Sequence, residues 1–317
     1  MSTELSESSA VSQAHSLADK LASEVGRIIL GKDEEIRLCL ACLLAGGHLL
    51  IEDVPGVGKT LLARALATVL DLRFSRIQFT SDLMPADVIG ITIYRQNEAD
   101  FKFHEGPLFA QIVLADEVNR ATPKSQSALL EAMEEHQITI DGETRKLPEP
   151  FFVIATQNPT HQIGTYPLPE SQLDRFFMRI GLGYPSEELE RSLLQGDDRR
   201  MMLGDLRPLV DNDGLKSMRT AVRNMTVSEA LLDYIQALVK HTRTAPEFEL
   251  GLSPRGSQDL VAASRAWAFI NGHAGVHPED VQAVFTAITS HRLRLRADLE
   301  STRQDAGQLA LDAVAIP

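Results

Sequence analysis

The chain of 317 residues is long enough for two domains, since one hydrophobic core typically serves about 100 to 200 residues. Its 44% hydrophobic and 24% charged residues are typical of a soluble globular protein, and no apolar run approaches the roughly 20 residues that span a bilayer. The net charge of −13 argues against a nucleic-acid-binding protein, because such proteins neutralise phosphates with Lys and Arg.

The first 45 residues are predicted to be a tail followed by helix. Residues 1–13 are rich in Ser and Glu and lack the basic start and apolar stretch of a signal peptide, so we expect a disordered tail and, by default, a cytoplasmic protein. Residues 14–45 have a helical pattern that is broken at two glycines. Cys39 and Cys42 lie among apolar neighbours there, and no second pair completes a zinc site, which favours two buried thiols.

Three continuous apolar runs predict strands that are buried on both faces of a parallel sheet. They are residues 48–51, 112–115 and 151–155, and each ends in a glycine-rich or polar segment. A fourth β-like run begins within residues 173–177. Because ligands bind such sheets at the carboxyl ends of the strands, we expect the site there.

Two stretches of alternating polarity predict hairpins that project from the sheet. The first covers residues 91–103, and the second covers residues 138–147 around Asp141-Gly142, a favoured two-residue turn. Both are candidates for contact with another molecule.

From about Pro185 the strands are expected to stop, so that residues 14–184 form an α/β domain and residues 185–317 a small all-α domain. The helix starts are predicted from a capping box, Thr226-x-x-Glu229, and from two prolines at first helical positions, in Ser253-Pro254 and at Pro278. The basic run at residues 291–296 follows a predicted helix, and we expect its cations to complement the negative end of the helix dipole.

The loop after the first strand has the properties of a phosphate-binding loop. Its glycines let backbone N–H groups approach the phosphates, and the following helix points its positive end at them. Lys59 is expected to contact the β and γ phosphates of ATP, and the Thr60 hydroxyl to bind Mg²⁺. The full pattern expects glycine at position 53, where this chain has Asp53. The predicted nucleotide-binding residues are Pro55, Gly56, Val57, Gly58, Lys59, Thr60 and Leu61.

Polar residues at the ends of the next two strands supply groups that the phosphate-binding loop lacks, namely carboxylates for Mg²⁺ binding and for water activation. Asp116 is predicted to hold Mg²⁺ and Glu117 to activate the attacking water. Asn158 is a candidate to polarise that water or to contact the γ-phosphate, although an Asn-Pro turn explains it as well.

Two arginines are further candidates. Arg255 lies in the first turn of a predicted helix, where the dipole disfavours a cation, so either a phosphate or a nearby carboxylate is expected beside it. Arg175 has the alternative of a local ion pair with Asp174.

These segments, in this order, closely resemble the MoxR family of AAA+ ATPases. The resemblance runs from about Gly26 to Arg292, and its Gly-Thr-Tyr-Pro-Leu-Pro-Glu loop is highly specific. One departure is His161-Gln162-Ile163, where relatives usually carry an acidic, polar stretch. The motifs that carry the resemblance are residues 52–60, 114–120, 155–159, 164–170 and 173–176.

The resemblance implies roles for several residues. Asn158 is the sensor-1 residue, Arg255 is sensor 2 in a helical lid, and Arg175 is the arginine finger, with Arg120 and Arg179 as the next candidates. The hairpin at 91–103 resembles the helix-2 insert, and that at 138–147 the pre-sensor-1 hairpin.

The resemblance also implies a ring-forming ATPase, usually hexameric, that remodels or matures protein clients together with partners that contain von Willebrand factor A domains. Three alternatives stay open: a DNA motor, the ATPase subunit of a metal chelatase, and a scaffold that binds ATP without turnover. The charge of −13 argues against the first, and Glu117, Asn158 and Arg175 together argue against the last.

Overall fold

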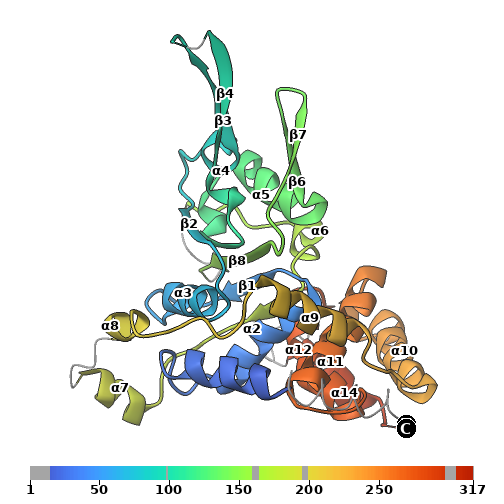
Figure 1. The fold of residues 1–317 in the computed structure, drawn as a ribbon. Coiled ribbons are helices and arrows are strands. Elements are labelled where there is room, and N and C mark those ends of the chain that lie inside the picture. The colour runs from blue at the N-terminus through green and yellow to red at the C-terminus, as the bar shows by residue number, and fades with distance from the viewer. Residues whose placement is uncertain (1–14, 98, 159–163, 195–198, 297–304, 317) are drawn as a thin grey trace, which may run out of the picture.

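A five-stranded parallel sheet lies at the centre of the computed structural model, which describes residues 15–97, 99–158, 164–194, 199–296 and 305–316 (Figure 1). The strand order is β2-β5-β8-β1-β9. The tail predicted over residues 1–13 and the departure at residues 161–163 lie outside the described residues.

The three apolar runs form the strands that were predicted from them: β1 (Leu49–Glu52), β5 (Ile112–Asp116) and β8 (Phe152–Gln157). They lie side by side in the middle of the sheet, where both faces are covered. The edge strand β2 (Phe74–Gln78) was not predicted from the sequence. The other edge strand, β9 (Met178–Ile180), begins later than the predicted fourth run, because the chain first makes a short helix, α6 (Glu170–Leu173).

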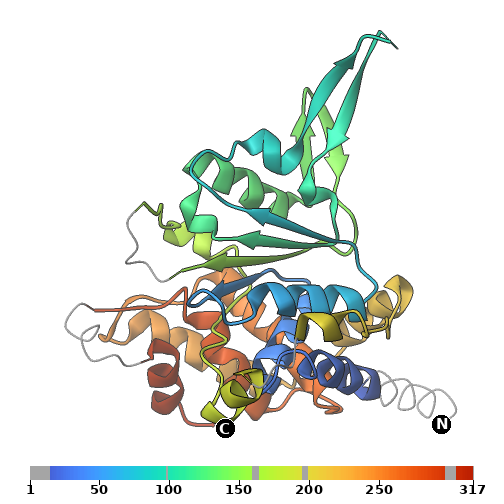
Figure 2. The same cartoon turned by 90° about the vertical axis from the view of Figure 1, so that its left-hand side faces the viewer.

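Helices cover both faces of the sheet (Figure 2). Leu49 and Ile51 of β1 face a core that includes α2 (Asp33–Ala45), α3 (Lys59–Val69) and the preceding helix over residues 15–26. Leu50 faces a second core against α4 (Pro85–Ile89) and α5 (Pro123–Glu135). Two 3-10 turns and two peripheral helices complete this half of the chain: η1 (Pro107–Phe109), η2 (Val118–Arg120), α7 (Glu187–Leu194) and α8 (Arg199–Leu203).

Two antiparallel hairpins project in the same direction from the sheet, as Figure 1 shows. They are β3 (Gly90–Arg95) with β4 (Asp100–Glu105), and β6 (Gln137–Ile140) with β7 (Glu143–Lys146), so both predicted hairpins are confirmed. Asp141 and Gly142 have φ angles of 52° and 81°, the left-handed values that a tight hairpin turn requires.

The C-terminal part is helical, with a small exception. Its helices are α9 (Asn212–Arg223), α10 (Glu229–Thr244), α11 (Pro254–Ile270), α12 (Pro278–Thr289) and α14 (Ala306–Ala313). The prediction that strands stop at Pro185 was wrong in one respect, because β10 (Phe248–Leu250) pairs with β11 (Arg294–Leu295).

The predicted helix starts are confirmed in two cases of three. Ser253 caps α11 through a bond from the Gly256 N–H, and Pro278 opens α12. The start of α10 was misassigned: Ser228, not Thr226, is the N-cap, and its hydroxyl accepts the Leu231 N–H at 3.2 Å.

One hydrophobic core continues from the sheet into the C-terminal helices. It joins the inner faces of α2 and α3 to residues of α9, α10, α11 and α12, and α2 packs directly against α9 and α11. Cys39 and Cys42 lie fully buried within it, as predicted, and burial raises the pKa of both thiols. Within the described residues, no helix is long and apolar enough to cross a membrane.

Candidate active site

The loop between β1 and α3 has the backbone that its glycines predict. Gly56 and Gly58 have φ angles of 90° and 98°, which side chains other than glycine rarely adopt, and Gly58 is the N-cap of α3. A Cβ atom added at Gly56 would meet no atom within 4 Å, so there is open space beside the loop. A helix N-terminus that opens onto free space is suited to an anion such as phosphate.

Asp53, the departure from the loop pattern, joins the loop to the segment after β9. Its carboxylate accepts the Val54 N–H at 2.7 Å and the Gly183 N–H at 2.5 Å. Its backbone carbonyl accepts a bond of 2.6 Å from Lys59 Nζ. The side chain therefore stabilises the entry to the loop, a task that glycine has no atoms to perform.

Asp116 and Thr156 form a pair across neighbouring strands. The Thr156 hydroxyl donates to Asp116 Oδ1 at 2.6 Å and accepts the Glu117 N–H at 2.9 Å. The other oxygen of Asp116 pairs with Arg76 of β2 at 2.6 Å. Thr156 thus orients both carboxylate residues from the adjacent strand.

Glu117 is held by three donors that come from three parts of the chain. Asn158 Nδ2 donates to Oε1 at 3.1 Å, while Gln78 Nε2 and Arg120 Nη1 each donate to Oε2 at 3.0 Å. The residue also has a φ of 57°, which is uncommon outside glycine and typical of functional positions. The carboxylate is thereby fixed next to Asn158, as a water-activating base and its sensor would require.

Lys59 lies among these carboxylates. Burial lowers the pKa of its ammonium group, whereas the negative charges of Asp53, Asp116 and Glu117 raise it. The loop and the carboxylate pair therefore meet at one site, as the sequence predicted. The hydroxyl of Thr60 and the carboxylate of Asp116 are hard oxygen ligands, so the donor set fits a small divalent cation such as Mg²⁺.

Arg175 and Arg255 lie together elsewhere. Arg175 Nη1 pairs with Glu134 Oε2 at 3.0 Å and donates to the carbonyl of Leu130, and Arg255 Nη2 pairs with Glu134 Oε1 at 2.9 Å. The alternative of an ion pair for Arg175 therefore holds in this structure, but its partner is Glu134 and not Asp174. For Arg255 the nearby carboxylate, one of the two expectations, is the partner in this structure.

The two arginines line a surface cavity of about 290 Å³ at the amino ends of the strands. Gly47 and His48, which precede β1, and Phe177, which precedes β9, line the same cavity. The phosphate-binding loop follows the carboxyl end of β1. Arg175 and Arg255 therefore lie at the opposite end of the sheet from the loop of their own chain.

His48 fixes the helix that carries Glu134. Burial lowers the pKa of His48 to about 3, so the ring is neutral. Its Nδ1 accepts the Val153 N–H at 3.0 Å, and its Nε2 donates to the carbonyl of Met133 at 3.1 Å. The residue before Glu134 is thus bonded to the start of β1.

The other two candidate arginines lie on the side of their own loop. Arg120 pairs with Glu117 at 3.0 Å. Arg179 pairs with Glu52, the last residue of β1, at 2.8 Å and donates to Ser290 just after α12. Arg120 thus belongs to the carboxylate cluster, and Arg179 joins the sheet to the C-terminal helices.

Arg292, from the basic run, is buried and joins the C-terminal helices to the segment around Arg175. It donates to Asp174 Oδ1 at 2.8 Å and to Asp259 Oδ2 at 2.5 Å, and to the carbonyls of Phe176 and Phe177. A further bond to the Ile288 carbonyl, in the last turn of α12, is the helix-end contact that was expected. Burial raises the pKa of Asp259 to about 6, although Arg292 opposes this.

Sequence reasoning missed Thr156, Gln78, Arg76 and Glu134. Thr156 stands two residues before Asn158, and its polarity inside an apolar strand is a usable signal. The other three are ordinary surface residues in the sequence, because their partners lie on other strands or helices.

Comparison with known proteins identifies one family model over the α/β part of the chain and another over the C-terminal helices. Residues 48–178 match the family model described as ATPase family associated with various cellular activities (AAA), and residues 240–309 match the AAA lid domain. The crystal structure of a proposed ATPase from Cytophaga hutchinsonii superposes with a TM-score of 0.89 and 37% identity, over 99% of both chains.

Several curated proteins are similar over most of their length. A Bacillus subtilis protein, YeaC, described as uncharacterized, is 44% identical over 90% of this chain and 89% of its own. Chaperone MoxR1 of Mycobacterium tuberculosis is 42% identical over 90% of this chain and 78% of its own. Protein MoxR of Paracoccus denitrificans is 29% identical over 96% of both chains.

Proposed function

Because the chain belongs to the MoxR family of AAA+ ATPases and is an ATP hydrolase, we propose that it works as a ring, usually of six subunits, that remodels or matures protein clients. The observation that carries the proposal is the position of Arg175 and Arg255. Both lie at the opposite end of the sheet from the loop of their own chain. They are therefore available to a neighbouring subunit's nucleotide.

One half of the proposed site comes from a single subunit. Lys59 offsets the charge of the β and γ phosphates, and the backbone N–H groups from Pro55 to Leu61 bind the phosphate oxygens. Mg²⁺, held by Thr60 and Asp116, would neutralise charge on the transferred phosphoryl group. Glu117 accepts a proton from the attacking water, and Asn158 keeps the Glu117 carboxylate in position.

The other half comes from the next subunit. Arg175 and Arg255 already share one anionic partner, the Glu134 carboxylate, at 3.0 and 2.9 Å. A γ-phosphate of the neighbour's ATP offers them several oxygens and more charge than one carboxylate. An arginine of this kind typically contributes about 10³ to 10⁵ in rate.

Such a contact is head to tail, because one end of the sheet meets the other end of the sheet in the next copy. Repeated contacts of this kind close into a ring when the rotation between subunits allows it. Shared active sites thus support the ring that the family resemblance implies.

The proposal that the protein acts on protein clients is supported by the β3–β4 hairpin and by the names of the relatives. Ile91, Ile93, Tyr94 and Phe101 are exposed on the hairpin, Phe101 by 68%. Exposed apolar side chains on a projecting element support contact with another protein. A relative is named a chaperone, so we assign this hairpin to protein clients and include a von Willebrand factor A domain partner in the proposal. We further propose the cytoplasm, where ATP is supplied.

Two alternatives use the same ATP site. A DNA motor would need an exposed basic surface, whereas His291 and Arg292 of the basic run are buried and the net charge is −13. The ATPase subunit of a metal chelatase differs in its client, so proteins captured by a Glu117→Gln ring in ATP would distinguish it.

The shared site is tested by mixing two inactive variants. Arg175→Ala keeps its own loop and Glu117, while Glu117→Gln keeps Arg175. In a mixed ring, the Arg175→Ala subunit receives Arg175 from a Glu117→Gln neighbour, so that interface is complete. Phosphate release should therefore recover in part, although each variant alone is inactive.

Two differently tagged variants and a pull-down establish that mixed rings form. Lys216→Ala, at an exposed lysine of α9, is the matched control and should keep normal turnover. Confirmed mixed rings without recovered activity would contradict the shared site. Near-normal activity of Arg175→Ala alone would remove this arginine from the mechanism.

A further inference from the structure

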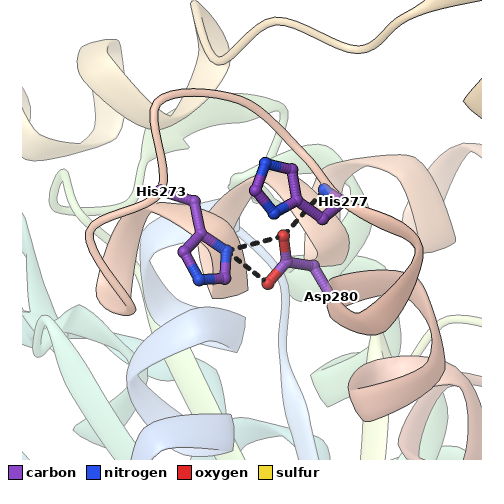
Figure 3. Close-up of side chains that lie close together, drawn as sticks. All are labelled: His273, His277 and Asp280. Atoms are coloured by element: carbon purple, nitrogen blue, oxygen red, sulfur yellow. Dashed lines mark hydrogen bonds and ion pairs between the residues drawn. The ribbon is translucent and has the colours of Figure 1, made fainter.

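Two histidines and an aspartate gather in the turn between α11 and α12. They are His273, His277 and Asp280, and Figure 3 shows their side chains facing one another. One ligand atom from each lies within 4.8 Å of the other two. Asp280 is buried, His273 is partly exposed and His277 is exposed, so the group opens to solvent on one side.

The His273–Asp280 pair already has the spacing of two metal ligands. His273 Nδ1 lies 3.0 Å from each oxygen of the Asp280 carboxylate. Two ligands bound to one Zn²⁺ at about 2.0 to 2.2 Å in a tetrahedral site lie about 3.4 Å apart. An ion can therefore replace the contact between these two side chains after a small adjustment of both.

His277 must turn to become the third ligand. Its ring stacks on that of His273, with 4.8 Å between centroids and 16° between planes, so in this rotamer the two rings do not point at one common position. The side chain is exposed, so turning its ring means leaving the stack on His273 for a position beside solvent. The ligand atom of His277 must come closer to the other two by at most about 1.4 Å, from the 4.8 Å limit to the spacing of about 3.4 Å between ligands of one ion.

The helix start does not require a histidine here. His277 is the N-cap of α12, where Ser, Thr, Asp and Asn are the favoured residues. Asp280 also accepts the His277 backbone N–H at 2.8 Å, so its carboxylate already caps the helix. Capping therefore accounts for Asp280, whereas the His273 ring bonds to the Asp280 carboxylate and takes no part in the cap.

The group is separate from the nucleotide site. Ser290, which bonds to Arg179, follows the last residue of α12, and His277 precedes the first. Twelve residues of helix place these two ends about 18 Å apart. An ion bound at His277 would therefore join α11 and α12, which pack against each other, at the turn between them. It would not contact the carboxylate cluster.

We propose that His273, His277 and Asp280 bind one divalent transition-metal ion, with Zn²⁺ as the representative, and that water completes its coordination. Two imidazoles and one carboxylate favour Zn²⁺, Ni²⁺ and Cu²⁺ over Mg²⁺ and Ca²⁺, which prefer ligand sets made of oxygen. The free thiols of Cys39 and Cys42 are fully buried and do not compete for the ion.

The test is a calorimetric titration of the full chain with Zn²⁺, in excess Mg²⁺ so that the nucleotide site takes up no Zn²⁺. One equivalent should bind, and His277→Ser and His273→Gln should each weaken that binding at least tenfold. Ser is a favoured N-cap, so His277→Ser removes the ligand and keeps the helix start. Equal melting temperatures of wild type and His277→Ser without Zn²⁺ establish that folding is intact.

His104→Ser, at an exposed histidine of β4, is the matched control and should leave the affinity unchanged. Electron paramagnetic resonance with Cu²⁺ gives a second readout, because nitrogen couplings report the number of bound imidazoles. The wild-type spectrum should indicate two, and that of His277→Ser one. Unchanged Zn²⁺ affinity in both ligand variants, or a Cu²⁺ spectrum that His277→Ser does not alter, would overturn the site.

Discussion

Thr156 donates its hydroxyl proton to Asp116 Oδ1 at 2.6 Å while it accepts the N–H of Glu117. One side chain on β8 thus orients the proposed metal ligand and the backbone of the proposed base. Thr156→Val keeps the shape and removes both bonds. We expect ATP to bind nearly as before and hydrolysis to fall about 10- to 100-fold, the usual effect of losing a residue that orients a metal ligand.

Phosphate release and binding of a fluorescent nucleotide measure the two quantities separately. Thr156→Ser restores the hydroxyl and should recover most of the turnover. Equal turnover of Thr156→Val and wild type would indicate that Asp116 is oriented well enough without this hydroxyl.

Lys59 and Glu117 should fail in different ways. Lys59→Ala removes the cation beside the β and γ phosphates, so we expect ATP binding to be lost or greatly weakened. Glu117→Gln keeps the shape of the side chain but its amide cannot accept a proton, so binding should persist without hydrolysis. If both variants lost binding equally, these assignments would be wrong.

Arg292 should be essential for stability, because two carboxylates depend on it. Arg292→Met leaves Asp174 and Asp259 without their shared cation, and removing one partner of a buried ion pair typically costs about 3 to 5 kcal/mol. Urea unfolding measures the loss. The double variant with Asp259→Asn should lose less, since one of the unpaired charges is then absent. A double variant as unstable as Arg292→Met would show that Asp259 is not what makes Arg292 necessary.

The pH dependence of stability should report on Asp259. Its pKa is about 6 in the folded chain against an ordinary 3.8, so the folded chain holds this proton more tightly than the unfolded chain. The corresponding stability is present below about pH 4 and lost as the pH rises through about 6. The stability of Asp259→Asn minus that of wild type should therefore increase as the pH rises from about 4 to 7, by at most about 3 kcal/mol. Asp213→Asn, at an exposed aspartate, is the control, and parallel curves for Asp259→Asn and wild type would refute the shift.

DNA should neither bind nor stimulate turnover at about 0.15 M salt, where weak contacts with phosphates are screened. The basic run that a duplex would need has its histidine and first arginine buried. Fluorescence anisotropy with a labelled duplex, and phosphate release with and without DNA, measure this. Tight binding or strong stimulation would favour the DNA motor.

The strands that could be predicted are those buried on both faces. Residues 112–115 and 151–155 are uniformly apolar, and such runs need no knowledge of their neighbours. The edge strand β2 carries Arg76 and Gln78, whose side chains face the carboxylate cluster, so its sequence lacks that pattern. An edge strand beside a polar site cannot be distinguished from a loop by hydrophobicity alone.

The same limit applies to the site. That Lys59, Asp116 and Glu117 come together at one place was predictable, because short motifs and the strands before them define their surroundings. The pairing of Arg175 and Arg255 with Glu134 depends on how α5, α11 and the segment before β9 meet in space. No spacing in the sequence contains that information.

The hydrophobic core that runs from α2 into the C-terminal helices makes the sheet and the helices one cooperative unit. Leu38 and Leu44 of α2 share that core with Leu260 of α11, so separating the two halves would expose apolar surface on both. A fragment that starts at residue 185 would lack this cover and should aggregate when expressed alone. Heating the whole chain should give a single calorimetric transition, and in the proposed ring ATP should move whole subunits against one another more readily than it opens this core.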